Sequence, residues 1–295
     1  MKDHAGRDVR PFDPDRYRIA AFDFDGTLIP AYAEVPEEEQ KALRALARQG
    51  VLVTAASGRN LTQVTQEILD LFRFCVLLNG AYVLDRETGE IVYASEMDRE
   101  KTAAMARILE AHGGIPTLYQ GAWQTTMDRV LEMPAWGAKN YADGSRELVR
   151  RVFIEGAELV PSAAAYLASP SARPVYKMHV VFSDVSRQNE AADAVAGIEG
   201  FTVLRMSNGD LEITNEGVSK ATALEALAKS RGLTPENVVT FGDSLNDYEM
   251  MKASGYTVAM GNSDAFLFGI ADYIADTCEN DGAAKAVRAL YGTAF

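Results

Sequence analysis

Short apolar runs that alternate with helical segments constrain the fold of this chain more than any other feature. Three such runs lie at residues 19–22, 51–56 and 75–78. They are brief and continuous, which is typical of strands that are buried on both faces. The segments between them, 36–50 and 60–72, carry apolar residues at helical spacing. This β-α-β-α-β order predicts a parallel sheet with right-handed crossover connections.

The pattern is interrupted in the middle of the chain and then returns. Residues 85–208 mix half-apolar strands with solvated helices, which favours a separate α+β layer over a continuation of the parallel sheet. From Ser219 onward the helix–strand alternation resumes, with buried strands expected at 238–241 and 256–260. The middle segment is therefore interpreted as an insertion.

These observations predict an α/β fold, in which a Rossmann-like core of parallel strands carries an inserted α+β cap domain. The expected division is a polar N-terminal tail at 1–16, a core built from 17–84 and 209–295, and a cap at 85–208.

Composition excludes several classes of partner. The 295 residues include 29 Lys and Arg against 42 Asp and Glu, a net charge of −13, which argues against binding to nucleic acid or to an anionic membrane. No apolar run reaches the length of about 20 residues that a membrane span needs. Cys75 and Cys278 form no spaced framework, which suits a reducing compartment. The N-terminus lacks the apolar region of a signal peptide, so we expect the cytoplasm.

Two carboxylates, Asp23 and Asp25, follow the first strand. Side chains at positions i and i+2 of a strand point the same way, so these like charges would crowd each other. A divalent cation would compensate them, and Gly26 would let the backbone turn tightly around it. The alternative is an ordinary solvated turn that ends a strand.

Polar residues end three further strands of the predicted core, at Ser57, Asn79 and Asp243. In an open parallel sheet, ligands bind at the carboxyl ends of the strands. These stretches should therefore meet Asp23 and Asp25 in one crevice.

Each of these positions has a chemical use at such a crevice. Asp23, Asp243 and Asp247 can share one hard cation through carboxylate oxygens. Ser57 precedes a predicted helix and can donate to a phosphate. Lys220 lies in the first turn of its helix, where the dipole disfavours a cation, so a nearby anion would explain it. Taken singly, each residue is more often a cap, a turn or a surface side chain; their order along the chain is what favours a shared site.

Four motifs resemble those of the haloacid dehalogenase superfamily: Asp23–Thr27, Ser57–Arg59, Gly217–Lys220 and Gly242–Asp247. The Cof-type branch is also similar in the stretches Asn79–Ala81 and Leu211–Ile213, and in the insertion between the second and third motifs. The resemblance covers the core, whereas the cap matches only in size and position. The polar tail and Ala221, where the branch often has glycine, depart from the pattern.

This resemblance implies specific roles. Asp23 would be the nucleophile that takes the phosphoryl group, and Asp25 would be the general acid and base. Phosphoryl oxygens would contact Ser57, Lys220 and Asn246. Mg²⁺ would be held by Asp23, by the backbone carbonyl of Asp25, and by Asp243, with Asp247 supporting it directly or through water.

The expected function is a Mg²⁺-dependent phosphatase of small phosphorylated metabolites, with sugar phosphates as the favoured class. A phosphotransferase or phosphomutase with the same core is the main alternative. A receiver-like signalling protein and a non-catalytic binder of phosphometabolites are weaker alternatives. The expected assembly is a monomer or a small homo-oligomer.

The cap offers five polar or aromatic candidates for substrate contact: Trp123, Asp128, Lys177, His179 and Arg205. Residues of these types on strands are usually solvated or structural, so the sequence does not select among them.

Overall fold

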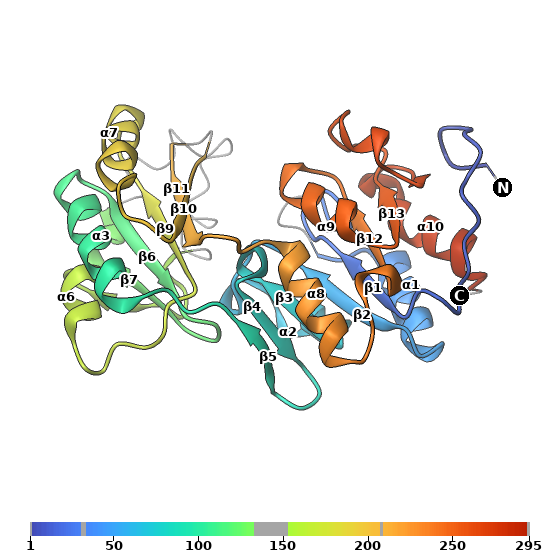
Figure 1. Cartoon of the computed structure of the whole chain (residues 1–295), viewed down its shortest axis with the longest axis horizontal. Helices are drawn as coiled ribbons and strands as arrows, with labels where there is room; N and C mark the ends of the chain where they lie inside the picture. The colour runs from blue at the N-terminus through green and yellow to red at the C-terminus, as the bar shows by residue number, and fades with distance from the viewer. Residues whose placement is uncertain (1, 31–33, 133–152, 207–208, 294–295) are drawn as a thin grey trace. The chain divides into compact units, whose positions relative to one another are not determined.

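The structure is a computed structural model that describes residues 2–30, 34–132, 153–206 and 209–293 (Figure 1). The chain forms two compact units. The first, here called the core unit, comprises residues 1–59, 65–94 and 219–295, and the second, the inserted unit, comprises 60–64 and 95–218.

The described residues of the core unit build an eight-stranded sheet. Its order is β14 (Tyr273–Ile274), β13 (Tyr256–Ala259), β12 (Val238–Gly242), β1 (Ile19–Phe22), β2 (Leu52–Ala56), β3 (Phe74–Leu77), β4 (Tyr82–Asp85) and β5 (Ile91–Ala94). Pairing is parallel from β14 to β3, and β4 and β5 add an antiparallel hairpin. The predicted α/β fold class is confirmed.

Helices cover this sheet because its central strands are apolar on both faces. The α-helices are α1 (Glu37–Arg48), α2 (Gln66–Leu69), α8 (Lys220–Ser230), α9 (Tyr248–Ala253) and α10 (Gly282–Tyr291). Apolar side chains of α8 and α9 pack against Ile19 and Ala21 of β1, while α1 packs against α10. Of the helices in the described ranges, none combines the length and the apolarity needed to cross a bilayer.

The single helix expected over 60–72 is wrong. The chain instead forms a 3₁₀ turn at Leu61–Gln63 and the short helix α2. Val64 between them is extended, with φ −120° and ψ 129°. Residues 60–64 group with the inserted unit, where Asn60, Thr62 and Gln63 donate hydrogen bonds. These non-local bonds compete with a continuous helix, which local spacing cannot reveal.

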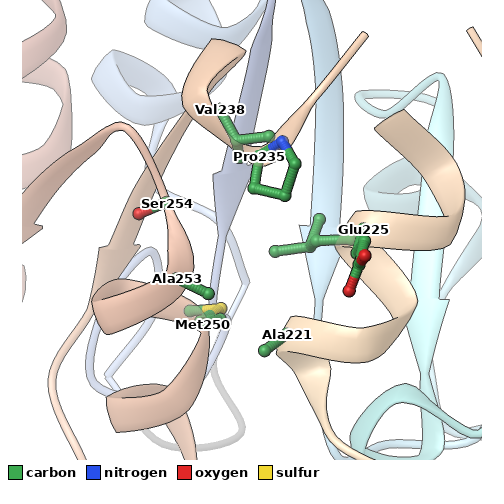
Figure 2. Close-up of a pocket in the computed structure, with 8 residues that line it drawn as sticks. Ala221, Glu225, Pro235, Val238, Met250, Ala253 and Ser254 are labelled. Carbon is green, nitrogen blue, oxygen red and sulfur yellow. The ribbon is translucent and has the colours of Figure 1, made fainter. Parts of the chain in front are cut away.

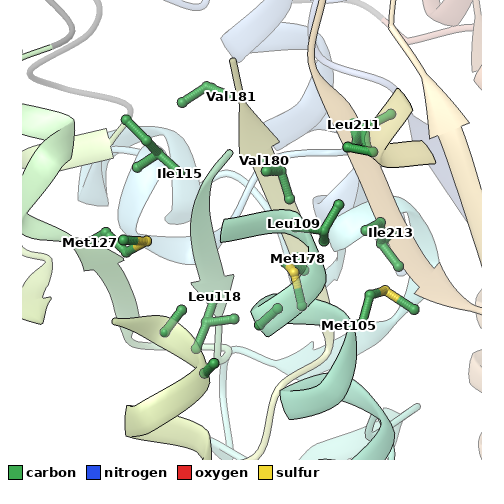
Figure 3. Packing of buried hydrophobic residues seen from close by; sticks show 14 of the residues in the cluster. Met105, Leu109, Ile115, Leu118, Met127, Met178, Val180, Val181, Leu211 and Ile213 are labelled. Carbon is green, nitrogen blue, oxygen red and sulfur yellow. The ribbon is translucent and has the colours of Figure 1, made fainter. Parts of the chain in front are cut away.

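The inserted unit is an antiparallel sheet backed by helices. Among its described residues the strand order is β10 (Phe201–Arg205), β11 (Leu211–Asn215), β9 (Lys177–Val181), β6 (Ile115–Tyr119), β7 (Gln124–Met127) and β8 (Glu158–Val160). Strands β7 and β8 pair in parallel, and the other described pairs are antiparallel. The helices are α3 (Arg99–Ala111), α6 (Ala163–Ala168) and α7 (Val185–Val195). Figure 3 shows Met105 and Leu109 of α3 meeting Met178 and Val180 of β9 in a separate apolar core.

The two units divide the chain at different points from those expected. The hairpin of β4 and β5 belongs to the core unit, because β4 pairs with β3, so the first division falls at 94–95 and not at 84–85. Strand β11 belongs to the inserted unit, because it pairs with β9 and β10, so the second division falls at 218–219. The boundary expected at 208–209 touches residues 207–208, which lie outside the described ranges.

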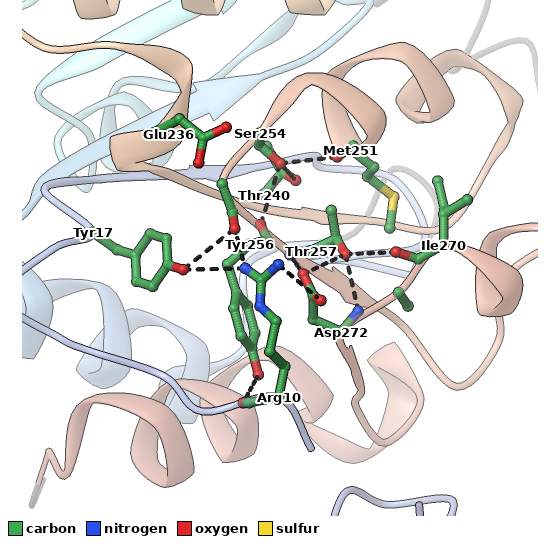
Figure 4. Close-up of polar contacts among 12 residues, drawn as sticks. Arg10, Tyr17, Glu236, Thr240, Met251, Ser254, Tyr256, Thr257, Ile270 and Asp272 are labelled. Atoms are coloured by element: carbon green, nitrogen blue, oxygen red, sulfur yellow. Dashed lines mark hydrogen bonds and ion pairs between the residues drawn. The ribbon is translucent and has the colours of Figure 1, made fainter. Parts of the chain in front are cut away.

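The segment expected to be a polar tail is packed on the core unit. The guanidinium of Arg7 donates to the carbonyls of Phe268 and Ala271 at 3.0 and 3.2 Å. Figure 4 shows the guanidinium of Arg10 between Tyr17 and Asp272. The hydroxyl of Tyr256 donates to the backbone carbonyl of Arg10. The two-residue strand β14 is an edge, and the backbone N–H of His4 donates to the carbonyl of its Ile274. Arg7 of the predicted polar tail therefore satisfies loop carbonyls, and the backbone N–H of His4 satisfies a carbonyl of the edge strand.

Candidate active site

Three carboxylates from two loops meet at the carboxyl ends of neighbouring strands. Strands β1 and β12 pair in parallel with Phe22 opposite Phe241. Asp23 directly follows β1 and Asp243 directly follows β12, so both leave the sheet at the same edge. Together with Asp247, each offers one oxygen atom, and these oxygens all lie within 4.8 Å of one another. The structure thus brings together the three carboxylates that the sequence predicted to lie near one another.

Lys220 is the cation that faces this cluster. Its Nζ donates to Oδ1 of Asp23 at 2.6 Å and to Oδ1 of Asp247 at 2.7 Å, and the residue is only 1% exposed. Burial alone would lower the pKa of Lys220, but the two carboxylates outweigh it and raise that pKa. The lysine disfavoured by the helix dipole is thus compensated by ion pairs.

A close backbone approach positions that lysine. At Gly80, which has φ +101°, an added Cβ would lie 2.0 Å from the carbonyl oxygen of Ser219. Ser219 caps α8, because its side chain accepts a hydrogen bond from the backbone N–H of Thr222. The turn after β3 therefore packs directly on the start of the helix that carries Lys220, and only glycine fits there.

One lysine does not balance three carboxylates. Burial raises the pKa of Asp23 above its usual range, and the neighbouring Asp247 and Asp243 add to this against the opposing pull of Lys220. Burial and Asp247 also raise the pKa of Asp243, to about 6. Burial is the largest cause of both raised pKa values, and the repulsion among the three carboxylates adds to it.

The donor set and its surroundings fit a hard divalent cation. Carboxylate oxygens are the ligands that Mg²⁺ and Ca²⁺ prefer. At Gly26, which has φ +84°, a Cβ would lie 2.3 Å from Oδ2 of Asp243, so the turn after β1 can approach that carboxylate only as glycine. Asp247 is held differently: its Oδ2 accepts from the backbone N–H groups of Asp243 and Ser244, at 3.0 and 3.2 Å.

Two residues that the sequence did not single out hold this cluster in place. The hydroxyl of Thr27 donates to Oδ1 of Asp243 at 2.9 Å. The amide nitrogen of Asn262 donates to the carbonyl of Gly26 at 2.7 Å, while its oxygen accepts from the backbone N–H of Cys278 at 2.9 Å. Thr27 could have been found from its place in the first motif, whereas nothing near Asn262 in the sequence points to Gly26.

The carboxylate of Asp25 is not part of the three-carboxylate group. It forms a two-pronged ion pair with Arg59, whose Nε and Nη2 donate to the two oxygens of Asp25 at 2.9 and 2.5 Å. The sequence included Arg59 only as the last residue of a motif and gave it no role. The predicted contribution of the Asp25 carbonyl to the metal stays a prediction.

The side-chain hydrogen bonds described for Ser57 and Asn246 are local to their own turns. Ser57 follows β2 and is buried; its hydroxyl oxygen accepts from the backbone N–H of Arg59 at 3.2 Å. Asn246 is exposed, and its side-chain oxygen accepts from the hydroxyl of Ser244 at 2.8 Å. Both stay predictions as phosphate-binding residues.

The cap candidates fall into two groups within the inserted unit. Lys177 is buried in β9 and forms an ion pair with Glu212 at 2.6 Å. His179 on the same strand is half-buried and pairs with Asp210 at 2.9 Å. Trp123, Asp128 and Arg205 are exposed.

A pocket in the core unit lies between α8 and α9, as Figure 2 shows. It is lined by Ala221 and Glu225 of α8 and by Met250 and Ala253 of α9. Its volume of about 10 Å³ is room for one water at most, so it is no metabolite site.

Comparison with known proteins identifies the family. The sequence profile of the haloacid dehalogenase-like hydrolases matches residues 20–287. The chain belongs to this family. It is accordingly an enzyme of the Cof type and a phosphoric monoester hydrolase, and the alternative of a receiver-like signalling protein loses its support.

Individual relatives agree with this assignment. The 5-amino-6-(5-phospho-D-ribitylamino)uracil phosphatase YcsE of Bacillus subtilis is 27% identical over 275 residues, which cover 92% of this chain and 94% of that protein. A Streptococcus pyogenes protein, named for both phosphatase and peptidyl-prolyl cis-trans isomerase activities, is 30% identical over 277 residues. That match covers 93% of this chain and 54% of the relative, so the chain spans about half the length of the streptococcal protein.

Solved structures share the fold. A haloacid dehalogenase-like hydrolase from Bacteroides thetaiotaomicron superposes with a TM-score of 0.77 at 24% identity, covering 93% of this chain and 99% of that one. A subclass IIB sugar phosphatase of the superfamily gives a TM-score of 0.71 at 21% identity, with coverage of 93% and 99%.

Proposed function

We propose that this enzyme is a Mg²⁺-dependent phosphatase that hydrolyses small phosphorylated metabolites, with sugar phosphates as the main substrate class, through an aspartyl-phosphate intermediate. The observation that carries the proposal is the buried contact of Lys220 with Asp23 inside a three-carboxylate cluster. Family membership supports phosphate ester hydrolysis, and the sugar phosphatase of the same fold suggests the substrate class.

In the first step Asp23 acts as the nucleophile. One of its carboxylate oxygens forms a bond to phosphorus while the bond from phosphorus to the ester oxygen breaks, and Asp25 gives its proton to that leaving oxygen. Lys220 favours the ionised form of Asp23 and, with Ser57, binds phosphoryl oxygens. Asp23, Asp243 and the Asp25 carbonyl would hold Mg²⁺, which would supply further neutralisation of phosphoryl charge.

In the second step Asp25 acts as the base. It removes a proton from a water molecule, whose oxygen bonds to phosphorus as the bond from phosphorus to Asp23 breaks. Inorganic phosphate leaves, Asp23 is again a free carboxylate, and Asp25 has recovered its proton.

The test is phosphate release by the purified chain from a panel of sugar phosphates, nucleoside monophosphates and pyridoxal phosphate, with Mg²⁺ or with EDTA. We expect turnover with Mg²⁺, none with EDTA, and the highest kcat/KM among sugar phosphates. Asp23→Asn should abolish turnover while keeping the fold, whereas Asp15→Asn, an exposed carboxylate change in the same unit, should not. Unchanged activity of Asp23→Asn, or full activity in EDTA, would refute the proposal.

A further inference from the structure

Arg59 donates two parallel hydrogen bonds to the carboxylate of Asp25, at 2.9 and 2.5 Å. Its side chain is 8% exposed, against 37% for that of Asp25. A planar guanidinium that meets both oxygens of a carboxylate fixes the orientation of that group as well as its position. A half-exposed aspartate without such a partner would exchange among rotamers.

The backbone that carries Arg59 is itself fixed. Its N–H donates to the hydroxyl of Ser57 at 3.2 Å, and its carbonyl accepts from the N–H of Leu78 at 3.1 Å. At the preceding Gly58, an added Cβ would lie 2.6 Å from the side-chain oxygen of Asn79. The guanidinium also lies 5.9 Å from the centre of the Phe24 ring. Arg59 therefore reaches Asp25 from an anchored loop.

The ion pair separates carboxylates that would otherwise compete for one cation. Asp25 is two residues from Asp23, yet the oxygens that lie within 4.8 Å of one another come from Asp23, Asp243 and Asp247. A carboxylate whose oxygens are bound to a metal ion is not directed at the leaving group or at the attacking water. Proton transfer by Asp25 requires that its side chain stay off the cation.

We propose that Arg59 is a positioning residue that reserves Asp25 for proton transfer, by holding its carboxylate away from the cation-binding cluster. This inference rests on the proposed function, because it assigns Asp25 the acid and base roles. Without the two hydrogen bonds from Arg59, the Asp25 side chain turns toward the cation and Lys220, and both proton transfers slow.

The choice of leaving group tests this. A good leaving group such as p-nitrophenol needs no protonation, whereas an alkyl alcohol does. In Arg59→Gln, we expect kcat for an alkyl phosphate to fall by about 100-fold, the lower end of the range for general acid catalysis, with little change in KM. With p-nitrophenyl phosphate, the first step should survive and the second should become limiting. Rapid mixing should then show a burst of p-nitrophenol close to one per enzyme, followed by slow turnover.

Matched variants separate positioning from structural damage. Arg59→Lys keeps one charged bond and should fall between wild type and Arg59→Gln. Arg73→Gln removes a similar two-pronged pair, with Asp85, elsewhere in the core unit, and should give no burst. Thermal unfolding of each variant reports whether the fold is intact.

Two results would overturn the inference. A large rise in KM with kcat retained would make Arg59 a substrate-binding residue. An equal loss with both esters and no burst would make its role structural. If wild-type enzyme releases no phosphate from either ester, the proposed function fails instead, so the two failures are distinguishable.

Discussion

Replacing Lys220 by Met tests how the carboxylate cluster is compensated. Methionine keeps much of the side-chain length and removes only the charge and its hydrogen bonds. Two ion pairs disappear, at 2.6 Å to Asp23 and at 2.7 Å to Asp247. Both carboxylates stay buried, with 5% and 0% of their surfaces exposed.

These distances set the expected loss of stability in Lys220→Met. At an effective dielectric constant of about 20, opposite charges at 2.6 Å attract by about 6 kcal/mol before desolvation is counted. Removing one partner of a buried pair costs about 3–5 kcal/mol, because the remaining charge has lost its compensation. We therefore expect Lys220→Met to lower the free energy of unfolding by about 3–5 kcal/mol without Mg²⁺. Loss of one donor to the phosphoryl group should lower kcat by about 10²–10³.

The assay is urea unfolding near pH 8, with EDTA and with a series of Mg²⁺ concentrations. Because a bound cation would replace the missing charge, Mg²⁺ should raise the stability of the variant more than that of wild type. Lys229→Met is the control, since Lys229 is exposed at the other end of α8. A loss of less than about 1 kcal/mol in EDTA, or near-normal turnover, would refute the reasoning.

Three further changes probe other polar groups. Burial raises the pKa of Glu39 to about 8, despite hydrogen bonds from two backbone N–H groups, so wild type should lose stability as pH rises from 4.5 through about 8. Glu39→Gln should remove this loss, so the free energy of unfolding of the variant should gain on that of wild type by at most about 3 kcal/mol between about pH 5 and pH 7. A difference in unfolding free energy that stays constant with pH, measured by urea unfolding, would contradict this. Burial would lower the pKa of His179, but hydrogen bonds to Asp210 and Glu212 outweigh it and raise the pKa to about 9. The contribution of His179 to stability is full below about pH 6.5 and is lost as pH rises through about 9. His179→Gln should abolish this pH dependence of the unfolding free energy, which amounts to at most about 3 kcal/mol, and the control His112→Asn should retain it. Asn262→Ala, which frees the carbonyl of Gly26, should raise the Mg²⁺ concentration for half-maximal activity by about tenfold, and an unchanged Mg²⁺ titration would count against it.

The sequence predicted most of the core fold because the signals there are local. The run Ile19–Phe22 is buried in its entirety, and Ser219 caps α8 through its own side chain. Signals of this kind depend on a few neighbouring residues, and tertiary contacts did not override them. The helix expected over 60–72 failed for the opposite reason, since Thr62 and Gln63 bond to residues near 120.

The candidate site divides in the same way. Asp23, Asp243 and Lys220 could be grouped from the sequence because each ends a strand or begins a helix, and the topology of a parallel sheet brings such positions together. The pairing of Arg59 with Asp25 could not be predicted, because it depends on how the loop after β2 folds against β1. Asn262 was also missed, as its contact with Gly26 spans 236 positions of sequence.

The sequence by itself therefore determined the parallel α/β core, the insertion and the set of polar residues at the strand ends. Only the tertiary structure decided which of those residues share charge: Lys220 with Asp23 and Asp247, and Arg59 with Asp25. The physical reason is the distance along the sequence over which each interaction acts. Apolar periodicity and capping act over a few residues, whereas the balance of buried charge is set by side chains that approach from separate elements and lose their water together.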